Sequence, residues 1–212
     1  PSLRNADVGI SVDTAVDVAK HSASVVLLDK DLAVLAEGIR QGRRVFANTL
    51  KYVQVTMSAN FGNMMSMAVA AVVLPFLPLL PRQILLLNFL SDVPGMTIAA
   101  DRVDPESVAD PHGWDITRLR TFMIVFGLVS SVFALTTCAV LRWGFHSEAG
   151  LFRTGWFIES TATELAVMLV LRTRRRAWRS RPGTALLWSS AAIAALTVAL
   201  PFTPMANDLG LV

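Results

Sequence analysis

Apolar and polar residues follow one another in blocks along this chain, and the blocks are short at the start and long afterwards. Two short apolar runs, residues 6–12 and 24–28, flank a segment from Thr14 to Ser22 that has helical spacing. Gly9 lies inside the first run, as is typical of a buried strand that another segment approaches closely. Strand, helix and strand in this order predict the end of a parallel α/β sheet over residues 1–30, too short to enclose a core of its own.

An amphipathic helix is predicted for residues 31–56. Asp31 is a suitable N-cap, and apolar residues then recur on one face, at Leu32, Leu35, Ala36 and Ile39. A charge-free stretch begins at Tyr52, so the helix is expected to continue as a stalk into a membrane span. The alternative is an ordinary amphipathic surface helix.

Long charge-poor blocks predict five membrane-spanning helices, because a bilayer core requires about 20 apolar residues per helix. Within a membrane region of residues 53–207, the spans cover about residues 53–80, 83–100, 121–143, 154–171 and 183–203. The composition agrees, since a hydrophobic fraction of 53% and a mean hydropathy of +0.52 are too high for a soluble domain. The predicted fold is mostly α: a polytopic transmembrane helical bundle preceded by the tail of an α/β domain.

Basic residues predict the orientation of these spans. Six arginines crowd the segment 172–182, at Arg172, Arg174, Arg175, Arg176, Arg179 and Arg181. The positive-inside rule places this loop in the cytoplasm, and counting back places the segment 101–120 there too. The net charge of +3 is therefore explained by topology and by contact with membrane lipids, so we expect no nucleic-acid partner. The one cysteine, Cys138, excludes an internal disulfide.

One carboxylate lies within the second predicted span, where a charge is costly unless it is paired, hydrated or coordinating. This residue is Asp92; Asn88 lies on the same helical face and Ser91 is adjacent. Pro94 and Gly95 are expected to open the helix, so that backbone carbonyls become ligands as well. Carboxylate, amide and hydroxyl oxygens suit a hard cation such as Mg²⁺ or Ca²⁺, or a proton relay. The alternative is a protonated Asp92 that hydrogen-bonds to a neighbouring helix.

Other polar residues of the predicted spans extend this candidate site. Asn60 and Asn63 share a helical face, and Gly62 allows another helix to come close. A hydrogen-bonded pair between helices is the alternative for both. Glu159 and Glu164 are five residues apart and lie on different faces, so they do not form one bidentate pair. We expect them on an ion path, although Glu159 also suits simple contact with water near the outer surface.

Several strings of residues resemble P-type ATPases. In the soluble part they are similar to the end of the family's HAD-like phosphorylation domain, just after its Gly-Asp-Gly-x-Asn-Asp-x-Pro loop: Pro1-Ser2-Leu3, Ala6-Asp7-Val8-Gly9-Ile10, Ala19-Lys20 and Val25-Val26-Leu27-Leu28. In the membrane part they look most like the bacterial magnesium-transporting members: Ser58-Ala59-Asn60-Phe61-Gly62-Asn63, Leu74-Pro75-Phe76-Leu77-Pro78 and Gly155-Trp156-Phe157-Ile158-Glu159.

This resemblance implies the C-terminal fragment of a pump that carries a cation, Mg²⁺ in the first instance, across a bacterial plasma (inner) membrane. It implies that Asp92 binds the metal ion, with Asn88, Asn60, Ser91 and Asn63 as further ligands. ATP and the Mg²⁺ used with it would be bound mainly by the remaining domains of the parent pump. The phosphorylated aspartate lies outside this sequence, so we expect no catalytic residue here, a fragment at both ends, and no ATPase activity from the fragment alone.

Two other functions stay open. A P-type pump for Ca²⁺ or protons would also need Asp92, and the third span has Ala134 where magnesium pumps that resemble it tend to have an acid. A non-enzymatic membrane remnant or subunit would use the spans only for assembly, and would be indifferent to the loss of the Asp92 charge.

Overall fold

A computed structural model of the chain describes residues 2–109, 113–173 and 175–212. Residues 110–112 of the predicted loop 101–120, and Arg174 of the predicted loop 172–182, lie outside this description. The chain divides into two compact units, residues 1–44 and 45–212, with the division inside one long helix. Each unit is described by itself.

The first unit contains the predicted strand–helix–strand order. Helix α1 (Ser2–Asn5) precedes strand β1 (Ile10–Val12), helix α2 (Asp17–His21) and strand β2 (Val25–Leu27). The two strands pair in parallel, with Ile10 opposite Val25. Gly9 is buried, and a Cβ atom there would lie 2.5 Å from the carbonyl oxygen of Leu3. The close approach predicted at this glycine is therefore confirmed, and a side chain has no room there.

Helix α3 (Leu32–Val73) covers both the predicted stalk and most of the first predicted span. Asp31 caps it as expected, because its Oδ1 accepts a hydrogen bond of 2.8 Å from the backbone N–H of Ala33. The helix ends at Val73, before the predicted limit at residue 80. Pro75 explains this end, since a proline disfavours the helical conformation of the residue before it.

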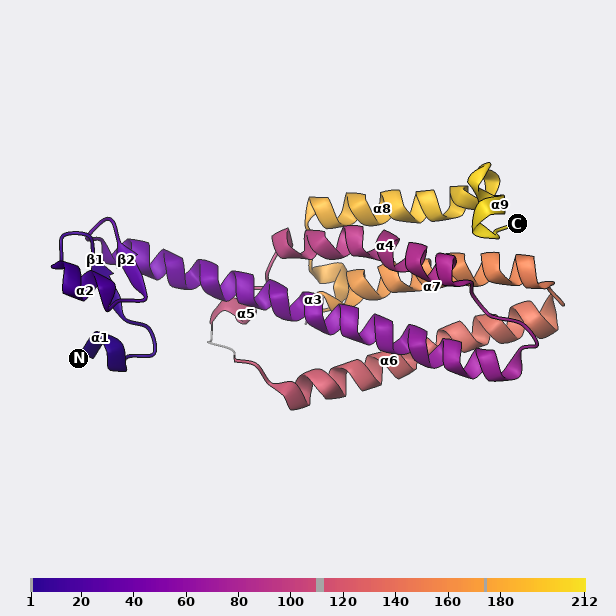
Figure 1. The fold of residues 1–212 in the computed structure, drawn as a ribbon, viewed down its shortest axis with the longest axis horizontal. Coiled ribbons are helices and arrows are strands. Elements are labelled where there is room, and N and C mark those ends of the chain that lie inside the picture. Colours follow the sequence, from indigo (N-terminus) through magenta and orange to yellow (C-terminus); the bar gives the residue numbers. More distant parts are fainter. Residues whose placement is uncertain (1, 110–112, 174) are drawn as a thin grey trace. The chain divides into compact units, whose positions relative to one another are not determined.

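The second unit is a helical bundle. After α3 it contains α4 (Pro81–Thr97), a 3₁₀ turn η1 (Ile98–Ala100), the short α5 (Glu106–Ala109), α6 (Ile116–Ala139) with a π-helical turn η2 (Val140–Gly144), α7 (Ala149–Leu171), a 3₁₀ turn η3 (Ala177–Arg179), α8 (Thr184–Ala199), a 3₁₀ turn η4 (Leu200–Phe202) and α9 (Met205–Leu209). Helix α4 packs against both α7 and α8, and α7 also packs against α6 (Figure 1). Among these helices α7 therefore has the most bundle neighbours, since it also packs against α8.

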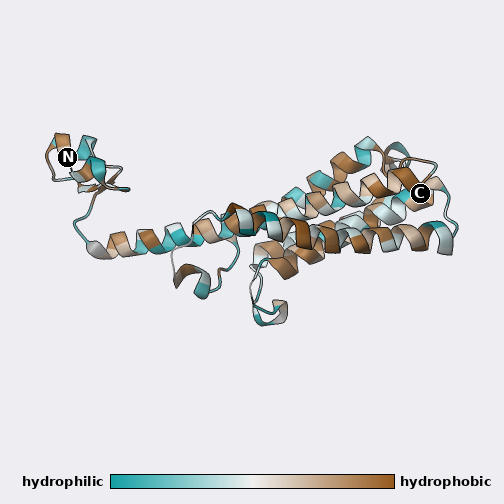
Figure 2. Cartoon of the chain, turned by 90° about the horizontal axis from the view of Figure 1, so that it is seen from below, coloured by the Kyte–Doolittle hydropathy of each residue, from teal (hydrophilic) through white to brown (hydrophobic). Residues whose placement is uncertain are grey.

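Three segments of the described chain are long and apolar enough to cross a membrane: Pro81–Ala100, Ile116–Gly144 and Thr184–Phe202. Helices α3 and α7 run over the other two predicted spans, and they carry the polar residues Asn60, Asn63, Glu159 and Glu164. Large apolar side chains on the bundle are exposed, for example Phe133 at 60% and Trp188 at 73%. Figure 2 shows hydrophobic residues along most of the bundle helices. An apolar exterior of this kind is what a lipid-facing bundle requires.

Helices α3 and α6 approach each other closely at two glycines. A Cβ atom on Gly62 would lie 2.8 Å from the carbonyl oxygen of Gly127. The Ser131 hydroxyl is within hydrogen-bonding distance, 3.0 Å, of the Gly62 carbonyl oxygen. The predicted close approach at Gly62 is confirmed, and it fixes the part of α3 that carries Asn60 and Asn63.

Candidate cation site

A polar cavity of about 230 Å³ lies where α3, α4 and α7 meet. Its lining contains five of the residues that the sequence analysis singled out, Asn60, Asn88, Ser91, Asp92 and Glu164. The other lining residues are Tyr52, Val55, Thr56, Gly95 and Met168. Three helices that are distant in sequence thus bring most of the candidate ligands to one place.

Helix α3 contributes Tyr52, Thr56 and Asn60, which recur every four residues and therefore lie on one face. Asn63 does not line the cavity, but it interacts with the carboxyl group of Glu164. Asn63 therefore lies near Glu164 without being one of the residues that line the cavity.

Helix α4 contributes the densest set of polar atoms. Asn88, Ser91, Asp92 and Gly95 lie on successive turns of one face. The Ser91 hydroxyl lies 3.0 Å from the carbonyl oxygen of Leu87 and 3.1 Å from that of Asn88. Because its proton is used within the helix, the lone pairs of this hydroxyl stay available to a cation.

The expected opening of α4 at Pro94 and Gly95 is wrong, because the helix is continuous from Pro81 to Thr97. Pro94 removes one backbone hydrogen bond, which leaves the Leu90 carbonyl without its helical N–H donor. The surrounding bonds keep the helix intact, so the backbone of this turn is not unwound into a set of carbonyl ligands.

Helix α7 contributes Glu164, which is 8% exposed. Its Oε2 atom is buried and has no hydrogen-bond partner among the described residues. Ser91 and Asn63 lie near this carboxyl group, and the Asp92 carboxylate is near enough to act on it as a like charge. A buried carboxylate beside a second carboxylate is costly unless a cation or a proton neutralises the pair.

Glu159 lies outside the cavity lining. Its Oε1 atom accepts a hydrogen bond of 2.7 Å from the Thr163 hydroxyl, whereas Oε2 is buried without a partner among the described residues. The structure thus separates the two glutamates of α7, as their spacing predicted. A role for Glu159 on an ion path stays a prediction.

The cavity offers two carboxylates together with amide and hydroxyl oxygens. No group of three His, Cys, Asp or Glu side chains that could hold a metal ion occurs in the described part of the chain. This donor set suits a hard cation, which takes oxygen ligands and keeps some of its water, rather than a transition metal held by imidazole or thiolate. Asn60, Asn88 and Asp92 are exposed in this chain, whereas Ser91 and Glu164 are buried. The bundle therefore forms one side of the cavity and leaves the other side open.

A buried group of charges lies where the bundle helices end, and the sequence analysis did not identify it. The Asp101 side chain is 0% exposed, and its Oδ2 atom lies 3.1 Å from Lys51 Nζ and 3.3 Å from Arg172 Nη1. Its Oδ1 atom accepts a hydrogen bond of 2.8 Å from the backbone N–H of Gly183. The Asp101 carboxylate thus connects α3, the end of α4, the end of α7 and the start of α8.

Further hydrogen bonds surround this charged cluster of Lys51, Asp101 and Arg172. Asn48 donates hydrogen bonds of 3.0 Å to the carbonyl oxygens of Ala99 and Asp101, and Arg172 donates to the carbonyl of Ser180. From the sequence Asp101 and Arg172 were expected only in cytoplasmic loops, because nothing local reveals that Arg172 becomes 1% exposed. The cluster fixes the turn of α3 that precedes the cavity.

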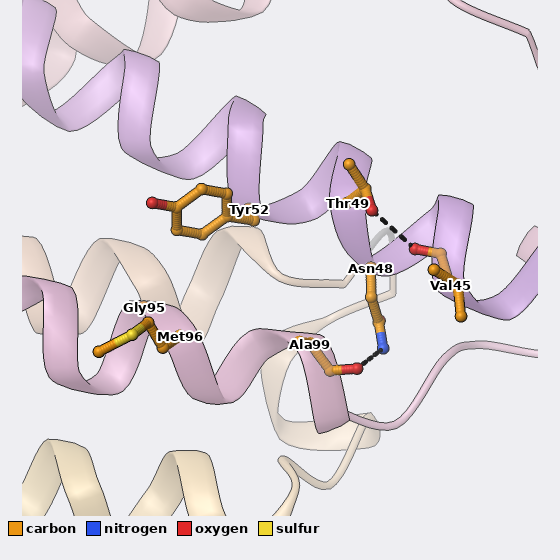
Figure 3. Close-up of a pocket in the computed structure, with 7 residues that line it drawn as sticks. All are labelled: Val45, Asn48, Thr49, Tyr52, Gly95, Met96 and Ala99. Carbon is orange, nitrogen blue, oxygen red and sulfur yellow. Dashed lines mark hydrogen bonds between the residues drawn. The ribbon is translucent and has the colours of Figure 1, made fainter.

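A second pocket, of about 290 Å³, lies between α3 and α4 next to the polar cavity. It is lined by Val45, Asn48, Thr49, Tyr52, Gly95, Met96 and Ala99 (Figure 3). Most of this lining is apolar. Tyr52 and Gly95 belong to both linings, so they form the wall that the pocket and the cavity share.

Comparison with known proteins connects this geometry to a family. The family model described as "Cation transporting ATPase, C-terminus" matches residues 76–212. Over its whole length the chain is 42% identical to the "Magnesium-transporting ATPase, P-type 1" of Salmonella typhimurium strain LT2 and 43% identical to that of Escherichia coli K12, covering 24% of each. It is 35% identical to a "Calcium-transporting ATPase" of Bacillus subtilis over 48% of this chain. The chain thus spans about a quarter of the length of its magnesium-transporting relatives.

Proposed function

Because this chain belongs to the cation-transporting P-type ATPases, whose C-terminal region it matches, we propose that it forms part of the membrane region of an ATP-driven Mg²⁺ pump. The observation that carries the proposal is the cavity in which Asp92 and Glu164 lie beside amide and hydroxyl oxygens. The identity of 42–43% over the whole chain to proteins named as magnesium-transporting supports the choice of ion.

In this proposal the cation binds between α4 and α7. Asp92 and Glu164 supply negative charge, and Asn60, Asn88 and Ser91 supply neutral oxygens. Mg²⁺ dehydrates reluctantly and usually keeps several waters, so a site with two carboxylates in a cavity of about 230 Å³ suits a partly hydrated ion. Asn63 lies near the Glu164 carboxyl group and outside the cavity lining.

The proposal also includes segments of the pump that lie outside this sequence. Two observations support this: one side of the cavity is open, and the chain covers about a quarter of the relatives' length. Segments of the pump outside this sequence close the cavity, bind ATP and carry the phosphorylated aspartate. The bundle spans a bacterial inner membrane five times, at α3, α4, α6, α7 and α8. The arginine-rich segment 172–182 and the segment 101–120 face the cytoplasm, where anionic lipid headgroups lie next to them.

Removal of the Asp92 charge tests the proposal. Asp92→Asn in the whole pump is expected to weaken Mg²⁺ binding by more than about 100-fold, because loss of even an outer partner of a metal ligand costs about 10–100-fold. The measurement is Mg²⁺ stimulation of ATP turnover and uptake in proteoliposomes. Glu148→Gln removes a carboxylate from an exposed position outside the cavity and serves as the matched control. Wild-type stimulation in Asp92→Asn refutes the site, and preferential stimulation by Ca²⁺ or protons in the wild type refutes the choice of ion.

A further inference from the structure

The wall between the pocket and the polar cavity consists of one aromatic ring and one glycine. Tyr52 on α3 and Gly95 on α4 face each other across the two helices (Figure 3). A Cβ atom on Gly95 would lie 3.5 Å from Cε2 of Tyr52 and 3.9 Å from Cε of Met168. The tyrosine ring therefore lies directly over the glycine, and no other side chain of α4 intervenes at this turn.

The pocket on the far side of this wall has space and an unused polar atom. A volume of about 290 Å³ is enough for several water molecules. Asn48 is 5% exposed, and its Oδ1 atom has no hydrogen-bond partner among the described residues although its Nδ2 atom makes two hydrogen bonds. A buried amide oxygen without a partner is costly, and a water molecule or a hydrated cation in the pocket would satisfy it.

The pocket and the cavity differ in the charge of the residues that line them. The pocket is lined by neutral residues, whereas the cavity contains the carboxylates of Asp92 and Glu164. A cation is therefore held weakly beside Asn48 and strongly beyond Tyr52. Tyr52 is 37% exposed, so its ring has room to move away from Gly95.

We propose that Tyr52 is the gate of the cation site: its ring, resting on Gly95, separates the neutral pocket at Asn48 from the carboxylate cavity, and cations enter and leave past it. The inference rests on the proposed function, because it assigns a route to the same site. Tyr52 is a positioning residue in this role and not a ligand. Since a gate changes the height of a barrier and not the energies on either side, it alters the entry and exit rates by the same factor.

The test is the kinetics of Mg²⁺ itself in the whole pump without nucleotide. Pump loaded with Mg²⁺ is diluted rapidly into a magnesium-sensitive dye to give the exit rate, and the approach to equilibrium at several Mg²⁺ concentrations gives the entry rate. Tyr52→Ala is expected to raise both rates by about tenfold, which corresponds to about 1.4 kcal/mol of barrier, with an unchanged Kd. Tyr52→Phe keeps the ring and is expected to keep wild-type rates.

Variants of the glycine test the same wall from the other helix. Gly95→Ala is expected to be neutral, since 3.5 Å is an ordinary contact distance, whereas Gly95→Leu extends into the ring and is expected to slow both rates. Met57→Ala, at an exposed position of α3 that lines neither space, is the matched control. An unchanged Kd shows in each variant that the site has folded.

Two results would overturn the gate. One is unchanged rates in both Tyr52→Ala and Gly95→Leu. The other is a change in Kd that matches the change in the exit rate, which would make Tyr52 a ligand or a structural residue. Failure of the proposed function has a different signature: Asp92→Asn would then keep saturable Mg²⁺ binding, whatever Tyr52 does.

Discussion

The charged cluster of Lys51, Asp101 and Arg172 makes a strong prediction about stability. Asp101→Asn keeps the shape of the side chain and an oxygen for the Gly183 N–H, but it removes the charge that two cations face. Arg172 would then stay 1% exposed with no carboxylate opposite it. We therefore expect the Asp101→Asn variant to have a much lower free energy of unfolding than the wild type, although the two side chains have nearly the same shape.

The magnitude follows from the burial of the two partners. Breaking a buried ion pair by removing one partner costs about 3–5 kcal/mol, because the other charge stays desolvated. Lys51 is 11% exposed and has a second acceptor at 2.7 Å in the Arg102 carbonyl, so most of the penalty falls on Arg172. Taking the lower end, about 3 kcal/mol, and about 2–4 °C per kcal/mol for a unit of this size that unfolds on its own, the Tm of the bundle's own transition falls by roughly 6–12 °C.

The assay is thermal unfolding of the purified pump in detergent, followed by tryptophan fluorescence at a fixed scan rate. Asp29→Asn removes the same charge from an exposed position of the first unit and is the control. Arg172→Met combined with Asp101→Asn is expected to recover part of the loss, because the more deeply buried of the two cations is then removed as well, and the double-mutant cycle measures the coupling. A Tm within about 2 °C of the wild type for Asp101→Asn, or additive effects in the cycle, would refute the reasoning.

Three further predictions concern other parts of the chain. Gly62→Ala is expected to lower the free energy of unfolding by about 1–3 kcal/mol, because its Cβ would meet a backbone oxygen at 2.8 Å; Gly42→Ala, on the same helix with no atom within 4 Å, is expected to raise it by up to about 1 kcal/mol in the same thermal assay. The hydrogen bond from Arg175 lowers the pKa of Glu106 from 4.5. This pair therefore stabilises the fold above pH 4.5 and loses its effect as the pH falls through the lowered pKa, and Arg175→Gln should raise the Glu106 pKa in a carboxyl NMR titration. Glu164→Gln is expected to weaken Mg²⁺ binding by at least about tenfold in an equilibrium titration, and an unchanged Kd would remove Glu164 from the site.

Much of the local structure could be predicted from the sequence, because it depends on neighbours along the chain. The strand–helix–strand order at the start, the Asp31 cap of α3 and the close approach at Gly62 were all visible as residue types at fixed spacings. The resemblance to P-type ATPases carried by short strings was confirmed by the match of residues 76–212 to the family. The position of Asn88 and Asp92 on one face of α4 followed from the helical repeat alone.

Other features depend on how helices pack, and a linear pattern does not contain that information. The sequence placed Glu159 and Glu164 on different faces of one helix, but only packing against α4 turned Glu164 toward Asp92 and left Glu159 outside the cavity. The Pro94 and Gly95 pair suggested a broken helix, yet the remaining backbone bonds keep α4 continuous.

The sequence by itself thus indicated the order of helices and strands, the three segments that are long and apolar enough to cross a membrane, and the polar residues on the helices, because periodicity and composition act over a few residues at a time. Only the tertiary structure decided which of those polar residues share a cavity, that Asp101 and Arg172 are buried together, and that Tyr52 rests on Gly95. These are contacts between residues far apart in the chain, and their energies depend on burial that exists only once the helices are packed.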